Sequence, residues 1–281
     1  MAINIDKTTE IVSNLLFGIS KIGQLPIEKN FDSESLTRFC RNNYPLVFGI
    51  VFCYAAFLIF GTRVMKFKKP FDLKAPLILW NVALCLFSFI GMCRTVPFIL
   101  ATIMTNDFES TVCTAPTEWG NGTTGFWVML FIFSKVPELI DTVFIVLRKR
   151  SLIFLHWYHH ITVLLFCWNA YATRSGSGLY FVSMNYSVHA LMYGYFALQA
   201  MNAAKGFPVL LITLSQILQM FIGTGVCISA WYFMLNGRQC HNDLSNLIAG
   251  GSMYASYLYL FVAFALEKFG RKPLQKEKKL E

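Results

Sequence analysis

The sequence predicts an all-α integral membrane protein with seven transmembrane helices. The chain has 281 residues, of which 56% are hydrophobic and 14% are charged, whereas a soluble domain carries about a quarter charged residues. Seven apolar runs follow residue 44, and each is long enough to cross a bilayer as a helix. These runs and their short connectors use nearly all of the chain, which excludes a large soluble domain.

The apolar runs divide the chain into three parts. The expected spans are residues 45–62, 76–101, 124–146, 153–172, 177–199, 207–235 and 246–266. Together they form a membrane domain, residues 45–266, between a lumenal N-terminal segment, residues 1–44, and a basic cytosolic tail, residues 267–281. In the N-terminal segment, IVSNLLFGISKIG is too short and too polar to span, and it suits an interfacial helix. The first residues lack the basic and apolar regions of a cleaved signal peptide, so none is expected.

The distribution of Lys and Arg orients the chain in the membrane. The connectors 63–75, 147–151 and 201–206 and the tail 267–281 hold 15 Lys and Arg residues, and the alternate connectors hold two. Because cytoplasmic loops carry the excess of basic residues, the tail is expected in the cytosol and the N-terminus in the lumen. The net charge of +9 is thus interpreted as a topology signal, and no nucleic-acid partner is expected.

Three features agree with this orientation. Lys278 and Lys279, fourth and third from the C-terminus, are similar to the dilysine retrieval signal of endoplasmic-reticulum membrane proteins, with a generic basic tail as the alternative. Asn121 begins an Asn-Gly-Thr glycosylation sequon in an expected lumenal connector, close to the next span. Cys113 and Cys240 are the two cysteines in lumenal connectors, and a disulfide between them suits an oxidising compartment. Two free thiols are the alternative.

The segment HWYHH gathers three of the five histidines of the chain. His156, His159 and His160 are spaced i, i+3, i+4, which places them on one face of a helix. They lie near the cytosolic end of the fourth expected span, where polar groups normally line a cavity or the bundle interior. Interfacial anchoring is the alternative. Three histidines can hold one zinc, but a di-iron centre needs several such boxes, and no metal is expected.

Three other spans carry one-sided polar stripes. The stripes are Lys135, Glu138, Asp141 and Thr142 in the third span, Asn185, His189 and Tyr193 in the fifth, and Thr213, Gln216 and Gln219 in the sixth. Each stripe alone fits hydrogen bonding between helices. Together with the histidines they predict a chamber open to the cytosol, with apolar space towards the lumen for a hydrocarbon chain. Arg148, Lys149 and Arg150 at its mouth suit a phosphorylated carrier.

Four segments carry a resemblance to a known family. KVPELIDT, HWYHH, NYSVHALMYGYF and TLSQILQ resemble the KxxExxDT, HxxHH, NxxxHxxMYxYY and TxxQxxQ motifs of the very-long-chain fatty acid elongases, the condensing enzymes of the endoplasmic reticulum. The similarity runs from the second expected span to the seventh. The stretch LRKRSLIFLHWYHHITVLL resembles the branch that acts on saturated and monounsaturated acyl chains. Phe196 stands where the family often has tyrosine. This difference removes the hydroxyl group of that tyrosine and leaves the expected chemistry unchanged.

The resemblance implies a fold, a reaction and partners. Six of the seven helices would enclose a narrow acyl tunnel open to the cytosol. The reaction would join a long-chain acyl-CoA to two carbons of malonyl-CoA, giving a 3-oxoacyl-CoA, carbon dioxide and CoA, without a cofactor. The expected partners are the bilayer, these two substrates, and the 3-oxoacyl-CoA reductase, 3-hydroxyacyl-CoA dehydratase and enoyl-CoA reductase of the cycle. A homo-oligomer is an additional option.

The resemblance also implies roles for single residues. His159 is expected to be the nucleophile, because a neutral imidazole can attack a thioester, and His189 its partner on the facing helix. His156, His160, Asp141 and Asn185 are expected to orient these two. The expected substrate-binding set is Lys135, Glu138, Thr142, Tyr193, Gln216, Gln219, Arg148, Lys149 and Arg150, with Lys135, Glu138 and Gln216 organising the chamber. Cys167, the rival nucleophile, lies two turns towards the lumen and is interpreted as packing.

Other classes of protein explain less of the sequence. A seven-helix lipid receptor accounts for the number of spans but not for the polar stripes in the cytosolic half. A transporter often has paired broken helices; Pro137 lies inside the third span, but no matching break is evident in a paired helix. A histidine-box metalloenzyme is the remaining alternative. Arg94, at the lumenal end of the second span, is expected to snorkel to the interface or to pair with a carboxylate.

Overall fold

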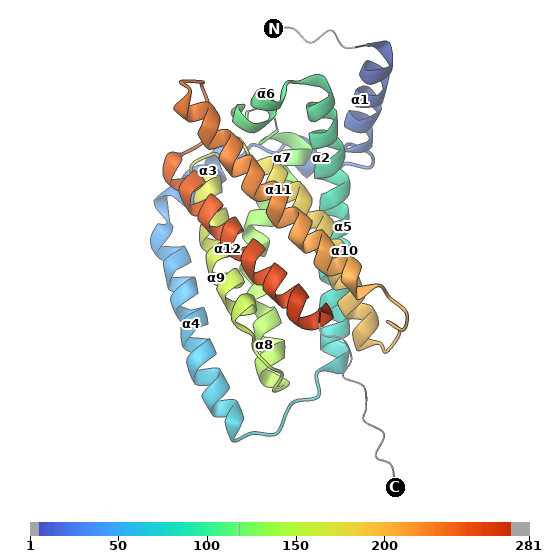
Figure 1. Ribbon diagram of the computed structural model, residues 1–281, viewed down its shortest axis with the longest axis vertical. Helices are drawn as coiled ribbons and strands as arrows, with labels where there is room; N and C mark the ends of the chain where they lie inside the picture. The colour runs from blue at the N-terminus through green and yellow to red at the C-terminus, as the bar shows by residue number, and fades with distance from the viewer. Residues whose placement is uncertain (1–5, 118, 271–281) are drawn as a thin grey trace.

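The computed structural model describes residues 6–117 and 119–270, and the regular structure in these ranges is helical (Figure 1). The helices are α1 (Lys7–Ile19), α2 (Pro26–Lys29), α3 (Glu34–Asn42), α4 (Tyr44–Lys66), α5 (Lys74–Thr105), α6 (Phe108–Cys113), α7 (Gly122–Ser134), a 3₁₀ helix (Pro137–Leu139), α8 (Ile140–Leu147), α9 (Phe154–Ala172), α10 (Gly178–Ala200), α11 (Val209–Leu235) and α12 (Leu244–Phe269). Lys278 and Lys279 of the expected retrieval signal lie outside the described residues.

Helices occupy all seven stretches that the sequence marks as spans, with ends shifted by a few residues. Four of them, α4, α5, α11 and α12, are each long and apolar enough to cross a membrane. The other stretches are α7 with α8, which is interrupted, and α9 and α10, which carry the histidines and amides of the motifs. The chain is therefore an all-α, multi-pass membrane protein, as the composition predicts.

The third expected span, residues 124–146, is interrupted at Pro137, the proline that the sequence places inside it. The helix α7 ends at Ser134, a 3₁₀ turn occupies Pro137–Leu139, and α8 begins at Ile140. Proline has no backbone N–H, and its ring clashes with the carbonyl four residues earlier, so it interrupts an α-helix. The interruption lies inside the KVPELIDT motif and brings the Lys135 and Glu138 side chains together.

The connectors alternate between two ends of the bundle (Figure 1). The end drawn at the bottom holds the connectors 67–73, 148–153 and 201–208, and the opposite end holds α1, α2, α3, α6 and the connectors 173–177 and 236–243. We call the first the basic end, because the Lys- and Arg-rich connectors gather there, and the second the capped end. This arrangement agrees with the alternation that the charge count assumes.

The two helices α5 and α10 approach each other closely at Gly91. A Cβ atom on Gly91 would lie 2.4 Å from the Tyr186 ring, so only glycine fits at this point. The buried Tyr186 ring also packs edge-on against Phe131, at 5.2 Å between ring centroids, and its hydroxyl donates to the Trp127 carbonyl oxygen at 2.8 Å. Tyr186 therefore joins α5, α7 and α10 in one rigid contact.

Arg94 anchors the N-terminal segment to the capped end of α5. Its Nη2 lies 3.4 Å from Oε2 of Glu28, and both side chains are at least nine-tenths buried. The Nη1 of Arg94 donates to the carbonyl oxygens of Ser20 and Ile22, and Trp127 Nε1 donates to Glu28 Oε1 at 2.9 Å. Of the two expectations for Arg94, the structure shows pairing with a carboxylate. The expected interfacial helix corresponds to α1, which packs on α5.

Removing this buried ion pair should destabilise the protein. We expect Arg94→Leu to lower the free energy of unfolding by about 3 kcal/mol, because Glu28 would remain buried without its counter-ion. The measurement is thermal unfolding in detergent. Arg38→Leu is the control: Arg38 pairs with Glu34 at an exposed position, and such a pair contributes about 0.5 kcal/mol. Equal losses in the two variants would contradict the anchoring role.

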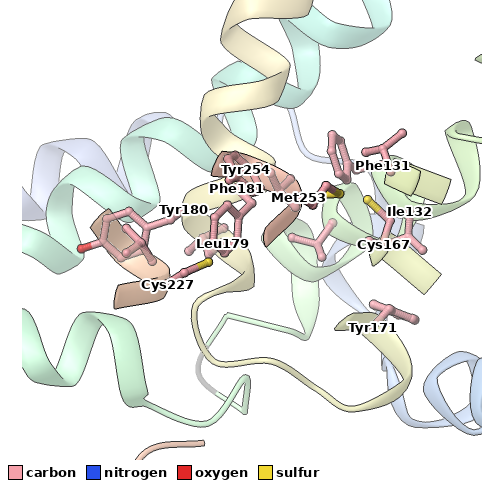
Figure 2. Packing of buried hydrophobic residues seen from close by; sticks show 14 of the residues in the cluster. Phe131, Ile132, Cys167, Tyr171, Leu179, Tyr180, Phe181, Cys227, Met253 and Tyr254 are labelled. Carbon is pink, nitrogen blue, oxygen red and sulfur yellow. The ribbon is translucent and has the colours of Figure 1, made fainter. Parts of the chain in front are cut away.

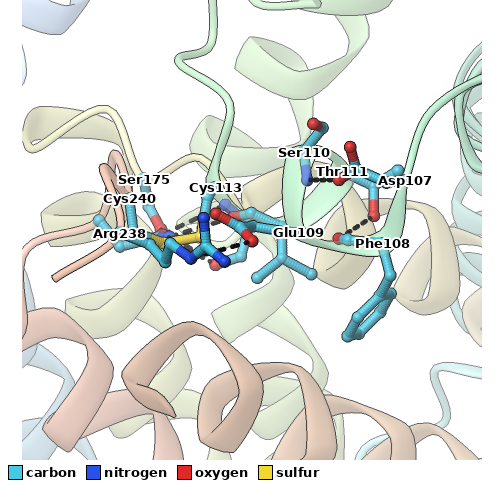
Figure 3. The surroundings of a disulfide bond; sticks show 12 residues. Asp107, Phe108, Glu109, Ser110, Thr111, Cys113, Ser175, Arg238 and Cys240 are labelled. Carbon is cyan, nitrogen blue, oxygen red and sulfur yellow. Dashed lines mark hydrogen bonds and ion pairs between the residues drawn. A yellow bond between two sulfur atoms is a disulfide. The ribbon is translucent and has the colours of Figure 1, made fainter. Parts of the chain in front are cut away.

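A disulfide joins two loops at the capped end (Figure 3). Cys113, the last residue of α6, is bonded to Cys240 in the connector 236–243. The backbone N–H of His241 donates to the Cys113 carbonyl oxygen at 2.8 Å, and Glu109 lies 3.8 Å from the Arg238 guanidinium. The bond therefore fastens α6 to the connector that joins α11 and α12.

Asp107 and Asn121 begin the helices α6 and α7 at the same end. Asp107 Oδ1 accepts from the backbone N–H of Ser110 at 2.7 Å, and this bond holds the pKa of the Asp107 carboxyl below its usual value. Asn121, the sequon residue, is exposed, and its Oδ1 accepts from the Ser33 backbone N–H at 2.9 Å. Asn121 thus fixes the N-terminal segment to the start of α7.

Cleavage of the disulfide should loosen the capped end. We expect the Cys113→Ala/Cys240→Ala variant to lose about 2–4 kcal/mol of unfolding free energy, because the cross-link limits the freedom of the unfolded chain. Peptide mapping without reductant should recover Cys113 and Cys240 in one linked pair of peptides. Cys53→Ala is the control, since this cysteine is free and exposed. Free thiols at both positions in the native protein would contradict the bond.

Candidate active site

The interruption at Pro137 creates a buried ion pair between Lys135 and Glu138. Nζ of Lys135 donates to Oε1 of Glu138 at 2.8 Å and to Oε2 at 3.0 Å, and it reaches Asn185 Oδ1 on α10 at 3.3 Å. The hydroxyl of Ser134 donates to Glu138 Oε1 at 2.8 Å, and the ammonium group lies 3.9 Å from the centroid of the Phe131 ring. The three N–H donors of the Lys135 ammonium group are therefore matched by three acceptors, the two oxygens of Glu138 and Oδ1 of Asn185.

The surroundings of this pair exclude water. Only 1% of the Lys135 side chain and 3% of the Glu138 side chain are exposed. Charges in an apolar interior carry a large desolvation cost, which is offset only when the pair has excellent geometry and full hydrogen bonding. Asn185 supplies the third acceptor, and the pair thus ties the turn between α7 and α8 to the middle of α10.

Asp141, one turn further along the third span, is held from two sides. Trp80 on α5 donates its indole N–H to Oδ1 of Asp141 at 2.6 Å, and the Tyr193 hydroxyl on α10 donates to Oδ2 at 2.7 Å. The Tyr193 ring in turn lies perpendicular to the His189 ring, at 5.3 Å between centroids. Asp141 therefore links three helices and borders the histidine on α10.

The three histidines of HWYHH lie in the first two turns of α9. The ring centroids of His156 and His160 are 4.4 Å apart, and those of His159 and His160 are 5.4 Å apart. Nε2 of His156 forms a 2.9 Å hydrogen bond with Oγ1 of Thr142, which also bonds the Tyr54 hydroxyl at 2.7 Å. The predicted shared face is thereby confirmed, and its first histidine is oriented by α8 and α4.

Tyr257 on α12 supports the middle histidine. Its hydroxyl donates to the His159 carbonyl oxygen at 3.2 Å and is hydrogen-bonded to Thr162. The rings of His159 and Tyr257 lie 5.2 Å apart. Tyr257 is almost fully buried and holds the start of α9 against α12 at His159.

These groups surround a cavity of about 910 Å³ in the half of the bundle near the basic end. This volume is typical of a site for a sizeable organic ligand. Of the residues that the sequence singles out, its wall includes His156, His159, His160, Glu138, Asp141, Asn185, His189, Tyr193, Thr213, Gln216, Gln219, Arg148 and Arg150. Four separate motifs therefore line one chamber. Within it, the buried Oε1 of Gln219 has no hydrogen-bond partner among the described residues.

Three predicted site residues do not line the cavity. Lys135 and Thr142 are buried behind its wall and act through Glu138 and His156. Lys149 turns away, and its Nζ donates to the carbonyl oxygens of Lys66 and Lys68. Lys149 has a φ of 53°, in the left-handed region, because the chain reverses there between α8 and α9. Direct substrate contact by Lys149 is not supported.

Sequence reasoning missed several residues of the site. Tyr54, Trp80 and Tyr257 hold the predicted groups from α4, α5 and α12, and Lys74 and Lys268 add positive charge to the cavity wall. A lone aromatic residue in an apolar span gives no sequence signal of a polar contact. Lys74 and Lys268 lie at helix ends in basic segments of the chain. That position could have indicated a role in the cavity, but we interpreted it only as a signal of the protein's orientation in the membrane.

Apolar side chains fill the half of the bundle near the capped end. Phe181, Met253, Tyr254 and Cys227 pack together there (Figure 2), and the rings of Phe181 and Tyr254 lie 4.9 Å apart. The expected apolar space towards this end is therefore occupied, and the deepest cavity residues on α11 are Gln219 and Met220. Cys167 belongs to the same buried cluster, in agreement with its interpretation as a packing residue.

The fold and the cavity define a multi-pass membrane protein with a buried polar chamber rich in histidine. The sequence matches the family described as "ELO: GNS1/SUR4 family" over residues 39–278, and the chain belongs to this family. It is 41% identical to "Very long chain fatty acid elongase 6" of Gallus gallus over 247 residues, or 86% of this chain and 91% of that relative. The human relative of the same name is 41% identical over 248 residues, again covering 86% and 91%. That of Drosophila melanogaster is 38% identical, covering 84% and 76%.

The buried ion pair should respond differently to single and double substitution. We expect Lys135→Met to lower the free energy of unfolding by about 3–5 kcal/mol, because Glu138 would remain as an uncompensated buried charge. Lys135→Met/Glu138→Leu should recover most of this loss, since no buried charge remains. Thermal unfolding in detergent measures both variants, with the exposed Lys149→Met as control. A double variant with the summed losses of its two single variants would contradict this prediction.

Proposed function

We infer that this protein is a condensing enzyme of fatty acid elongation, and we propose that it forms an acyl-imidazole on His159 before carbon–carbon bond formation. The observation that carries this proposal is the cavity that brings His159 and His189 together between basic side chains and a closed apolar end. Its wall is built from the four motifs of a chain whose relatives are named very long chain fatty acid elongases.

In the first step, the neutral His159 imidazole attacks the thioester carbon of a long-chain acyl-CoA. The new bond joins the ring nitrogen to the acyl carbon, the carbon–sulfur bond breaks, and the imidazole proton leaves with the CoA thiolate as free CoA. An acyl-imidazole remains reactive towards nucleophiles, so the enzyme divides one difficult step into two. His160 and Tyr257 border the His159 ring and backbone during this step, and His156 supports His160.

In the second step, malonyl-CoA loses carbon dioxide, and the electron pair of the broken bond forms an enolate. The enolate carbon attacks the acyl carbon on His159, giving 3-oxoacyl-CoA and releasing the imidazole, which takes up a proton. His189 and Asn185 line the cavity and offer donors to the enolate oxygen. The electrons come from the carbon–carboxylate bond, so the proposal requires neither metal nor nicotinamide.

The basic end suits the CoA part of both substrates. Lys74, Arg148, Arg150 and Lys268 contribute to the cavity wall there, and positive groups attract phosphates along the approach to a cleft. The acyl chain extends from His159 into the cavity between α10, α11 and α12, in place of the filled core near the capped end. Saturated and monounsaturated long chains are the proposed substrates.

We propose that the protein lies in the endoplasmic-reticulum membrane with seven spans, six of them around the acyl tunnel. The positive-inside rule places the basic end and the C-terminus in the cytosol, and the capped end with its disulfide in the lumen. Asn121 is then available to lumenal glycosylation, and the Lys278–Lys279 signal to cytosolic retrieval. The 3-oxoacyl product requires a reductase, a dehydratase and an enoyl reductase, which are the proposed partners.

The test is a condensation assay with purified protein. Malonyl-CoA labelled in its methylene carbon and acyl-CoAs of graded length should give labelled 3-oxoacyl-CoA, and His159→Ala should lower the rate by about a thousandfold or more, as loss of a nucleophile does. Acyl-CoA alone should leave an acyl group on the His159 peptide, detected by mass spectrometry. His241→Ala, at an exposed histidine of the capped end, should keep the wild-type rate.

The outcomes separate the proposals. Product formation by His159→Ala above a mock preparation would overturn the assignment of the nucleophile and leave the condensation standing. Folded wild-type protein that forms no product from any acyl-CoA would overturn the condensing activity itself, and stoichiometric bound metal would then favour a histidine-box metalloenzyme.

A further inference from the structure

The indole of Trp80 occupies a position that the cavity alone does not explain. Trp80 lies on α5, outside the four motifs, and does not contribute to the cavity wall. Its Nε1–H nevertheless donates to Oδ1 of Asp141 at 2.6 Å, the shortest hydrogen-bond distance that Asp141 makes in the described residues. Its ring also packs against Phe144 on α8, at 6.5 Å between centroids.

The two contacts of Asp141 assign a separate donor to each of its oxygens. Oδ1 accepts from Trp80 on α5, and Oδ2 accepts from the Tyr193 hydroxyl on α10 at 2.7 Å. A carboxylate group rotates about its terminal torsion with little preference, so a single donor would leave its direction poorly determined. Two donors from different helices fix both the plane and the position of the Asp141 carboxylate.

The fixed carboxylate controls the tyrosine beside His189. Because Tyr193 donates its hydroxyl proton to Asp141, its ring is held perpendicular to the His189 ring, at 5.3 Å between centroids. Loss of the Trp80 donor would leave Oδ1 of the half-buried Asp141 carboxylate without this partner, at a cost in free energy. The carboxylate would then turn towards another donor, and Tyr193 and His189 would lose their alignment.

We propose that Trp80 is a positioning residue for the condensation: its indole N–H fixes Asp141, and through Asp141 it aligns Tyr193 and His189 at the reacting carbon. The inference rests on the proposed function of the site. Since Trp80 does not touch the cavity, its hydrogen bond should affect kcat and leave the KM for acyl-CoA within about twofold. A hydrogen bond to a charged group makes the expected loss in kcat about tenfold or more.

The experiment compares two tryptophan analogues placed at position 80 of the full-length protein. Benzothienylalanine keeps the size of the indole but replaces the N–H by sulfur, and 4-fluorotryptophan keeps the N–H. We expect the first to lose about tenfold or more in kcat at constant KM, and the second to retain kcat within about twofold. Trp231→Phe is the control for tryptophan loss, because Trp231 is half exposed on α11 away from the cavity.

A second measurement separates positioning from a structural role. The kcat losses of Trp80→Phe and Tyr193→Phe should not add in the double variant, because both act through Asp141. A benzothienylalanine enzyme with wild-type kcat, or fully additive losses, would overturn the inference while wild-type condensation still supports the proposed function. If the wild-type protein performs no condensation, the proposed function is overturned, and the inference about Trp80, which rests on it, is overturned with it.

Discussion

The buried pair of Lys135 and Glu138 is the interaction on which the rest of the site depends. Two charges inside an apolar bundle are tolerated only with complete hydrogen bonding, and this requirement fixes the neighbouring elements. Pro137 interrupts the helix so that the two side chains meet. Asn185 on α10 accepts a hydrogen bond from the Lys135 ammonium group. The position of α10 relative to α7 and α8 follows, and with it the position of His189.

The same requirement repeats along the wall of the chamber. Both carboxylate oxygens of Asp141 accept hydrogen bonds, one from a donor on α5 and one from a donor on α10. Thr142 is hydrogen-bonded to both Tyr54 on α4 and His156 on α9. Polar groups that water cannot reach must find partners within the protein. The polar chamber is therefore also what binds the helices together, and reactive histidines are held by the network that stabilises the fold.

The two ends of the bundle differ in structure: one is closed by packing and cross-links, and the other contains the cavity. The capped end is closed by the Arg94–Glu28 pair, the Cys113–Cys240 bond and a core of aromatic side chains (Figures 2 and 3). The basic end keeps the cavity and its positive side chains. Within the described residues the disulfide lies at the capped end, and the connectors at the basic end, where large, charged substrates would be bound, are joined by hydrogen bonds such as those of Lys149.

Composition and motif spacing by themselves determined the membrane class, the approximate ends of the helices, and thirteen cavity residues, eleven of them in the four motifs and two, Arg148 and Arg150, in a basic connector, because hydrophobic length and helical periodicity are local properties of the chain. Tertiary structure alone decided which side chains complete each polar group. Trp80, Tyr54 and Tyr257 stand in apolar surroundings, and their hydrogen bonds depend on which helices become neighbours. For the same reason the partner of Arg94 and the outward turn of Lys149 were not readable from the sequence, since both depend on contacts between segments distant along the chain.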